Sequence, residues 1–182
     1  MAQNLIDKLE LEAFRKGITP RTKESMEWFR KRAQQLRRVN RRELMQSDPL
    51  ELRGRPIRGS MFMFFYDPKY KATLPYYDRF PLIIMMGREK GGFAGFNLHY
   101  LPPVLRAKFL DQVTNDDQIN LRAIARSPYF APCYKRYLTA HLRSRFAYVP
   151  PPEWEIASFL PTADFEKASK NQVYAQSRRM IR

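Results

Sequence analysis

The sequence predicts an α+β protein, with a small antiparallel β-sheet or barrel at about residues 60–100 between N-terminal helical arms and a helical C-terminal half. Apolar residues recur at helical spacing in the N-terminal part, form short runs of strand length between the arms and Tyr100, and return to helical spacing after it. We divide the chain into a basic helical arm and connector (1–58), a small β domain (59–101), and a helical region packed on it that ends in a basic tail (102–182).

The N-terminal arm is predicted to contain two amphipathic helices. Residues 4–16 mix apolar and charged side chains at helical spacing, and Gly17 can end a helix there. In the next segment Thr19 is expected to be the N-cap and Pro20 the first helical residue, because both residue types suit those positions. A Pro- and Gly-bearing connector then leads to the β domain.

One face of the second helix is apolar, since Met26, Phe29 and Leu36 recur on it. If these three side chains were exposed together they would form a patch that soluble monomers avoid, so we expect them to dock onto another protein. The alternative is that they pack within the chain, because amphipathic helices usually cover their own core.

The chain is strongly basic, with 33 Lys and Arg against 18 Asp and Glu and a net charge of +15. Such a surface suits nucleic acid, an anionic membrane surface or an acidic protein. No run approaches the roughly 18 continuous apolar residues of a membrane span, so no membrane partner is predicted. The candidate binding residues lie in the arm and the tail: Arg30, Arg37, Arg38, Arg41, Arg42, Arg178, Arg179 and Arg182.

Short apolar runs in the middle of the chain are typical of strands. The runs MFMFFY, FPLIIMM and GFAGFNLHYL are separated by turn-rich segments, and FPLIIMM–GREKGG–FAGFNLHY indicates a hairpin because its glycines permit a tight reversal. Whether the strands form an open sheet or a barrel is left open. Helical spacing returns at 102–113, 116–126 and 132–145.

No catalytic, metal or cofactor site is predicted. His99, His141 and Cys133 are not at the spacings of zinc or haem motifs, and phosphate-binding glycine motifs are absent from the sequence. His99 is expected to be a satisfied residue of the sheet. Asp67 and Asp78 flank an aromatic loop, which leaves a metal-dependent nuclease as an alternative hypothesis. Turn capping is the commoner role of such residues, so we expect a protein that is not an enzyme.

Aromatic and basic residues alternate in two segments. Tyr70, Tyr76, Tyr77 and Arg79 lie in one predicted loop, and 129–146 mixes tyrosine and phenylalanine with lysine and arginine. Such residues can stack on bases while the cations neutralise phosphates. Packing of the aromatic rings in the core is the alternative.

Long strings of this sequence resemble one family. The strings FMFFYDPKYKATLPYYDRFPLIIMM and GGFAGFNLHYLPPVLRAKFLD, the arm ITPRTKESMEWFRKRAQQLRRVNRRELM, the block YFAPCYKRYLTAHLRSRFAYVPPPEWEIASFLPT and the end VYAQSRRMI are similar to small proteins of T-even-like contractile-tailed phages and their cyanophage relatives. The resemblance implies a role in the virion, with other phage virion proteins as partners in a multi-chain assembly. It brings no catalytic residues with it.

We therefore predict a non-enzymatic structural component of a tailed-phage virion, in the tail, baseplate or neck, that docks through its basic arms. The first residues, MAQNLIDKLE, do not follow the signal-peptide pattern, so synthesis in the host cytoplasm is expected. The alternative is a DNA-associated virion protein that protects or holds the end of the packaged genome, with nucleic acid as its partner.

Overall fold

The computed structural model describes residues 5–36, 38–46 and 51–181. Ten short strands occur in this part of the chain: β1 (Leu52–Arg53), β2 (Met61–Met63), β3 (Tyr77–Asp78), β4 (Leu82–Glu89), β5 (Gly92–Asn97), β6 (Thr114–Asn115), β7 (Gln118–Ile119), β8 (Tyr134–Leu138), β9 (Phe146–Val149) and β10 (Phe165–Glu166). Six of them form one antiparallel sheet in the order β1-β9-β2-β4-β5-β8, while β3 pairs with β10 and β6 with β7.

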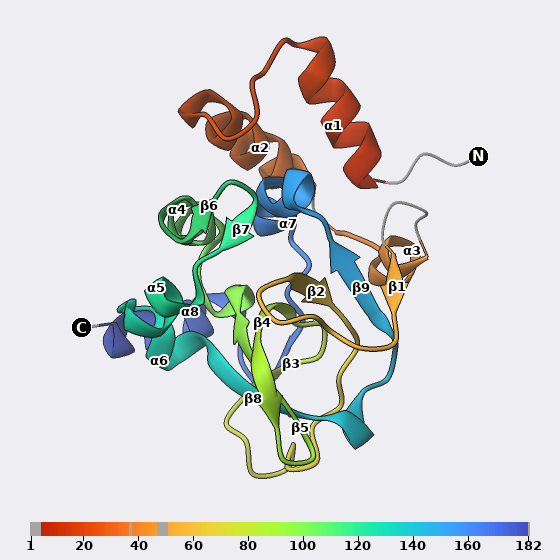
Figure 1. Cartoon of the computed structure of the whole chain (residues 1–182), viewed down its shortest axis with the longest axis vertical. Helices are drawn as coiled ribbons and strands as arrows, with labels where there is room; N and C mark the ends of the chain where they lie inside the picture. Colours follow the sequence, from red (N-terminus) through yellow and green to blue (C-terminus); the bar gives the residue numbers. More distant parts are fainter. Residues whose placement is uncertain (1–4, 37, 47–50, 182) are drawn as a thin grey trace.

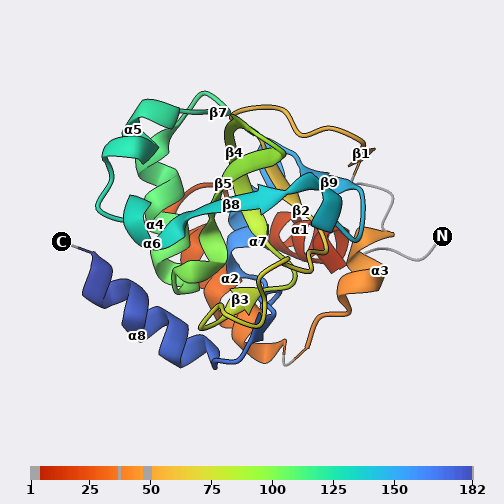
Figure 2. The same cartoon turned by 90° about the horizontal axis from the view of Figure 1, so that it is seen from below.

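The α-helices of the described residues lie above and to the sides of this sheet in Figure 1, and the turn of the β4–β5 hairpin extends below them (Figures 1 and 2). The α-helices are α1 (Leu5–Arg15), α2 (Lys23–Gln35), α3 (Arg41–Met45), α4 (Pro103–Val113), α5 (Leu121–Arg126), α6 (Phe130–Cys133), α7 (Trp154–Phe159) and α8 (Lys170–Met180). Three 3₁₀ turns accompany them: η1 (Leu98–Tyr100), η2 (Thr139–His141) and η3 (Pro151–Glu153). None of these helices is both long and apolar enough to span a bilayer.

The predicted α+β class with a small antiparallel sheet is confirmed, and the barrel alternative is wrong. The main sheet is open, because β1 and β8 lie at opposite edges of the described sheet. The hairpin predicted from glycine-rich reversal is β4–β5, which pairs Ile83 with Asn97 and, nearer the turn, Glu89 with Gly92. A β-bulge lies between Met85 and Gly87.

Five of the described strands, β6 to β10, arise from the region that was expected to be helical, which corrects the prediction for 102–182, and two of them join the main sheet. Residues 134–138 form β8 and 146–149 form β9, and both enter the main sheet. Apolar spacing at 134–138 fits a helix as well as a strand, and pairing with β5 decides for the strand. Because β1 also pairs with β9, the sheet joins all three predicted parts of the chain.

Both faces of the sheet are buried. On β2, Met61 and Met63 face the core beneath the helices, whereas Phe62 faces a second cluster on the opposite side. This period of two is the alternation expected of a strand. The second cluster is largely aromatic and contains Phe62, Phe64, Tyr66, Ile83, Met85, Phe93, Tyr137 and Phe146. It forms the inner wall of the site described below.

The N-terminal arm follows the prediction in part. Helix α1 ends at Arg15, and Gly17 adopts a positive φ of 66°, which glycine tolerates. The second helix begins later than expected, because Thr22 rather than Thr19 is its N-cap. Thr22 and Ser25 form a reciprocal capping box, which satisfies backbone donors at the start of the helix.

Gly92 is required where β5 meets β8. A Cβ atom built on Gly92 would lie 1.8 Å from the backbone oxygen of Tyr137, whereas one built on Gly87 would meet nothing within 4 Å. We expect Gly92→Ala to lower the free energy of unfolding by roughly 1–3 kcal/mol or more through overpacking, and Gly87→Ala to change it little. Urea denaturation of both variants measures this. Equal stability of the two would mean that β5 and β8 do not approach each other as closely as described here.

Candidate nucleic-acid interface

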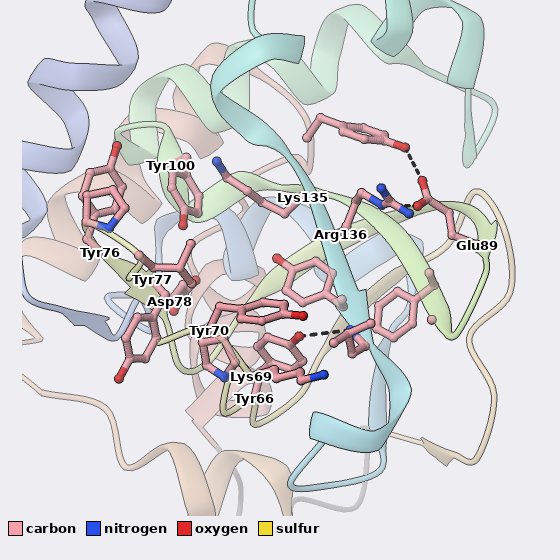
Figure 3. A pocket seen from close by; sticks show the side chains of 18 of the residues that line it. Tyr66, Lys69, Tyr70, Tyr76, Tyr77, Asp78, Glu89, Tyr100, Lys135 and Arg136 are labelled. Atoms are coloured by element: carbon pink, nitrogen blue, oxygen red, sulfur yellow. Dashed lines mark hydrogen bonds and ion pairs between the residues drawn. The ribbon is translucent and has the colours of Figure 1, made fainter. Parts of the chain in front are cut away.

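A cavity of about 720 Å³ opens between the loop after β2, the β4–β5 hairpin and β8. Its lining is dominated by seven tyrosines and four cations, which converge from different parts of the chain (Figure 3). These residues are Tyr66, Tyr70, Tyr76, Tyr77, Tyr100, Tyr134, Tyr137, Lys69, Lys90, Lys135 and Arg136. We call this cavity the tyrosine pocket. Asp78 and Glu89 are the carboxylates in its lining.

The inner wall of the tyrosine pocket is formed by buried, hydrogen-bonded tyrosines. Tyr137 is buried, its ring stacks on Phe93 at a centroid distance of 5.3 Å, and its hydroxyl accepts a hydrogen bond from Asn97. The hydroxyl of Tyr66 accepts from the backbone N–H of Leu138 at 3.0 Å. Burial raises the pKa of both Tyr66 and Tyr137, so their hydroxyl groups stay protonated and neutral.

The rim of the pocket is formed by the loop 67–76, and Lys167 binds its backbone. The Nζ atom of Lys167 donates to the backbone oxygens of Ala72 and Leu74, each at 3.0 Å. It also donates to the backbone oxygen of Lys71. Three backbone carbonyl groups of the loop thus share one ammonium group.

Lys135 carries the most enclosed positive charge of the pocket. Its side chain is half-buried, and its Nζ atom lies 4.1 Å from the ring centre of Tyr100 (Figure 3). Burial lowers the pKa of Lys135, because the surroundings disfavour its charged form. Within the described part of the chain Lys135 forms no ion pair, and the same holds for Lys69 and Lys90. Arg136 instead pairs with Glu89.

Asp78, at the base of the pocket, is fully occupied by hydrogen bonds. One carboxylate oxygen accepts from His99 Nδ1 at 2.7 Å and from Asn97 Nδ2 at 3.1 Å. The other accepts from two backbone N–H groups, those of Phe80 at 3.0 Å and Asp164 at 3.1 Å. Burial alone would raise the pKa of Asp78, but His99 and these hydrogen bonds hold it below its usual value.

His99 links this carboxylate to the opposite side of the core. Its Nε2 atom lies 2.9 Å from the hydroxyl oxygen of Thr162. Burial lowers the pKa of His99 although Asp78 opposes the shift, so the ring is neutral. A neutral ring that donates from Nδ1 to Asp78 accepts at Nε2 from Thr162. His99 is therefore a satisfied core residue, as the sequence suggested.

The two acids considered for a nuclease serve other roles. Asp78 is buried in the network just described, and Asp67 pairs with Lys71 at 2.9 Å and with Arg143 at 3.2 Å. The two carboxylates are thus engaged with separate partners and do not face a shared site. In the described residues no group of three or more His, Cys, Asp and Glu side chains is placed to hold a metal ion.

The predicted binding arginines are not gathered into one site. Arg37 and Arg182 lie outside the described residues. Arg41 stabilises the fold, because it donates to the backbone oxygens of Thr162 at 2.7 Å and Ala163 at 2.9 Å. The exposed members of the set are Arg30, Arg38, Arg42, Arg178 and Arg179.

Two of these exposed arginines, Arg178 and Arg179, are close in sequence to a residue of the tyrosine pocket. They occupy the last turn of α8, and the next residue, Met180, lines the pocket. Arg30 is on α2, which lies at the opposite end of the molecule from β8 (Figure 1). The cationic surface around the pocket therefore comes from α8 and from the lysines of the pocket.

The side chains expected to dock onto another protein lie against the chain's own core. Phe29 is only 6% exposed, so it is unavailable for docking, and that prediction is wrong for this residue. Met26 and Leu36 are half-buried and pack against the cluster beneath the helices. Helix α2 covers its own protein, which was the alternative.

Sequence reasoning identified part of the pocket. It selected two segments for stacking on bases. Of the first, Tyr70, Tyr76 and Tyr77 line the pocket, and of the second, 129–146, the pocket is lined by Tyr134, Lys135, Arg136 and Tyr137. It missed Tyr66 and Tyr100, which lie in or beside apolar runs and resemble core residues. No local signal marks them, because only the folded chain brings them to the loop.

The family comparison decides between the two functional hypotheses. A family model described as phage T4 terminal DNA protecting protein matches residues 4–128. The chain belongs to this family. The match confirms the resemblance to a T4-like phage family, and it includes the rim loop and η1 but ends before β8. Searches of curated proteins and of solved structures returned no match.

Membership of the terminal DNA protecting family corrects the leading functional prediction. A tail, baseplate or neck component that docks through basic arms is not supported, because the family is described by protection of DNA ends. The second hypothesis, a protein that acts at the end of the phage genome, agrees with this description. The phage origin of the family is also consistent with association with the virion.

Proposed function

We propose that this protein binds the ends of linear phage DNA in the virion and shields them from exonucleases, by binding and without catalysis. The observation that carries the proposal is the tyrosine pocket, whose lysines form no ion pair within the described residues, in a chain of net charge +15 that belongs to the terminal DNA protecting family. Nucleic acid is the partner, and synthesis in the host cytoplasm precedes its incorporation.

Aromatic rings in a pocket suit a DNA end better than the interior of a duplex. Within a duplex each base is stacked on its neighbours, and an enzyme must flip it out to reach its face. At an end the outer face is free, and stacking on an aromatic ring contributes about 1–3 kcal/mol per base. The tyrosine pocket offers such rings at a concave site.

The cations around the pocket supply the second part of the interaction. Lys69 and Lys90 are exposed and form no ion pair in the described chain, and Arg178 and Arg179 extend from the adjacent end of α8. Contacts of lysine and arginine with phosphates release counterions and favour binding independently of sequence. An end protector requires this, because it must hold whatever sequence lies at the terminus.

Protection from an exonuclease tests the proposal. The protein should slow the digestion of a linear duplex by an exonuclease that acts from ends. An unlabelled duplex with two open ends should compete for the protein, whereas one whose ends are closed by non-nucleotide linkers should compete much less. Equal competition by the open and closed duplexes would show general binding to duplex DNA and would contradict the proposal.

A further inference from the structure

We propose that the tyrosine pocket holds an unpaired nucleotide at the DNA terminus, so that the protein prefers an overhanging or frayed end to a blunt one. This inference rests on the proposed function and specifies the form of DNA that the site recognises. It follows from the size of the pocket, the exposure of its rings and the position of its charges.

The pocket has the size of a small-ligand site. Its volume of about 720 Å³ falls within the roughly 300–1,000 Å³ of cavities that enclose small molecules. One or two nucleotides fit such a volume, so the terminal nucleotides of one strand can fill it. A nucleotide that is already unpaired can enter without the loss of a base pair.

The exposed ring at the rim is placed to cover an entering base. Tyr70 is 61% exposed, and the Nζ atom of Lys69 lies 5.3 Å from its ring centre. Figure 3 shows Tyr70 and Tyr66 on the same side of the cavity, with Tyr76 and Tyr100 across from them. A large exposed aromatic side chain on a loop whose backbone Lys167 binds offers a flat apolar face at the rim.

The charges match a nucleotide with its phosphates. Lys135 lies inside the pocket next to Tyr100 and has no carboxylate partner in the described chain, while Lys69 and Lys90 lie at the rim. A partly buried ammonium group without a counterion is destabilised by its surroundings. A phosphate bound beside it would supply the missing negative charge and stabilise the ammonium form.

A blunt end must be unpaired before its base can enter. Overhanging nucleotides are already unpaired, and base extrusion costs least for such nucleotides. Opening one base-pair step corresponds to about a tenfold difference in affinity. An overhang of one to three nucleotides should therefore bind about tenfold more tightly than a blunt end.

Fluorescence anisotropy on three sets of duplexes of equal length tests this. Each duplex is closed at one end by a non-nucleotide linker, and the other end is blunt, carries a 3′ or 5′ overhang, or is also closed. We expect the protein to bind most tightly to a duplex with an overhang of at least one polarity. If blunt and overhanging ends bind equally, and both bind more tightly than the closed duplex, the inference is wrong while the proposed function stands. If the closed duplex binds as tightly as the open ones, the proposed function itself fails.

Substitution of Tyr70 tests whether the preference for overhanging ends arises in the tyrosine pocket. Tyr70→Ala should reduce affinity for the overhang by about fivefold or more, whereas Tyr70→Phe, which keeps the ring, should bind like the unmodified protein. Phe14→Ala is the matched control, because Phe14 is 80% exposed on α1, away from the pocket. Thermal unfolding verifies that all three variants fold. An undiminished preference for overhangs in Tyr70→Ala would exclude this ring from recognition.

Discussion

Replacement of Asp78 by alanine is expected to lower the free energy of unfolding by about 3–5 kcal/mol, the usual cost of removing one member of a buried charged network. The carboxylate of Asp78 accepts four hydrogen bonds, from His99, Asn97 and the backbone N–H groups of Phe80 and Asp164. Alanine leaves these buried donors without an acceptor, which costs far more than the bonds themselves contributed. Urea denaturation at neutral pH measures the decrease.

The matched control is Glu27→Ala on the exposed face of α2, which should change stability by no more than about 0.5 kcal/mol.

The pH dependence of the free energy of unfolding provides a second test. Because the pKa of Asp78 is held below its usual 3.8, its stabilising contribution is present above that pH and is lost as the pH falls through the lower value of the folded state. The difference between the wild-type protein and Asp78→Ala should therefore shrink in acid. If Asp78→Ala is as stable as Glu27→Ala at neutral pH, the network does not hold the pocket together.

Reversal of the two rim lysines should have the largest effect on DNA binding. In Lys69→Glu/Lys90→Glu, two cations that form no ion pair in the described chain become anions beside the phosphates they are proposed to meet. We expect the affinity for a DNA end to fall by roughly tenfold or more, and the slope of log affinity against log salt to become shallower by about 1 for each phosphate that the protein no longer neutralises. Titrations at several salt concentrations measure both quantities.

The control for this variant carries the same change of charge elsewhere. Lys8→Glu/Arg15→Glu alters two exposed residues of α1, which lies at the other end of the molecule from β8 (Figure 1). General attraction between a basic protein and DNA would weaken both variants equally. A specific role of the pocket predicts a much greater decrease for the rim lysines, and equal decreases would contradict it.

Local sequence patterns were sufficient for the class of fold and for the β4–β5 hairpin. The two strands of the hairpin are close together in the sequence, and the glycines at the turn between them predict the reversal directly. Strands β8 and β9 were missed because their partners lie far away in the sequence: Tyr137 pairs with Phe93, and Ala147 with Met63. Aromatic residues at spacings of three and four suit a helix in isolation, and tertiary pairing overrides that preference.

The candidate site, too, could be predicted only in part from local sequence patterns. The high density of positive charge in the arm led us to predict that its arginines bind a partner. Arg41 instead donates hydrogen bonds to two backbone carbonyl groups of its own chain. Lys69 and Lys90 are single cations in separate turns, and neither stands out in the sequence. They line one cavity with Lys135 only when β5 pairs with β8. Basic arms also suit protein docking and DNA binding equally well, so charge alone could not choose between the two hypotheses.

For the proposed function, the hydrogen bonds of Lys167 bear on the rate at which a DNA end would be captured. This residue lies shortly before α8 and grips the rim loop, so the loop with Tyr70 and the helix with Arg178 are joined at one point. A site whose walls are already in place loses little conformational entropy when it is filled. Its capture rate is then set by diffusion and by the attraction between unlike charges, with no wait for a loop to close. Such a protein can occupy a newly exposed terminus on first encounter.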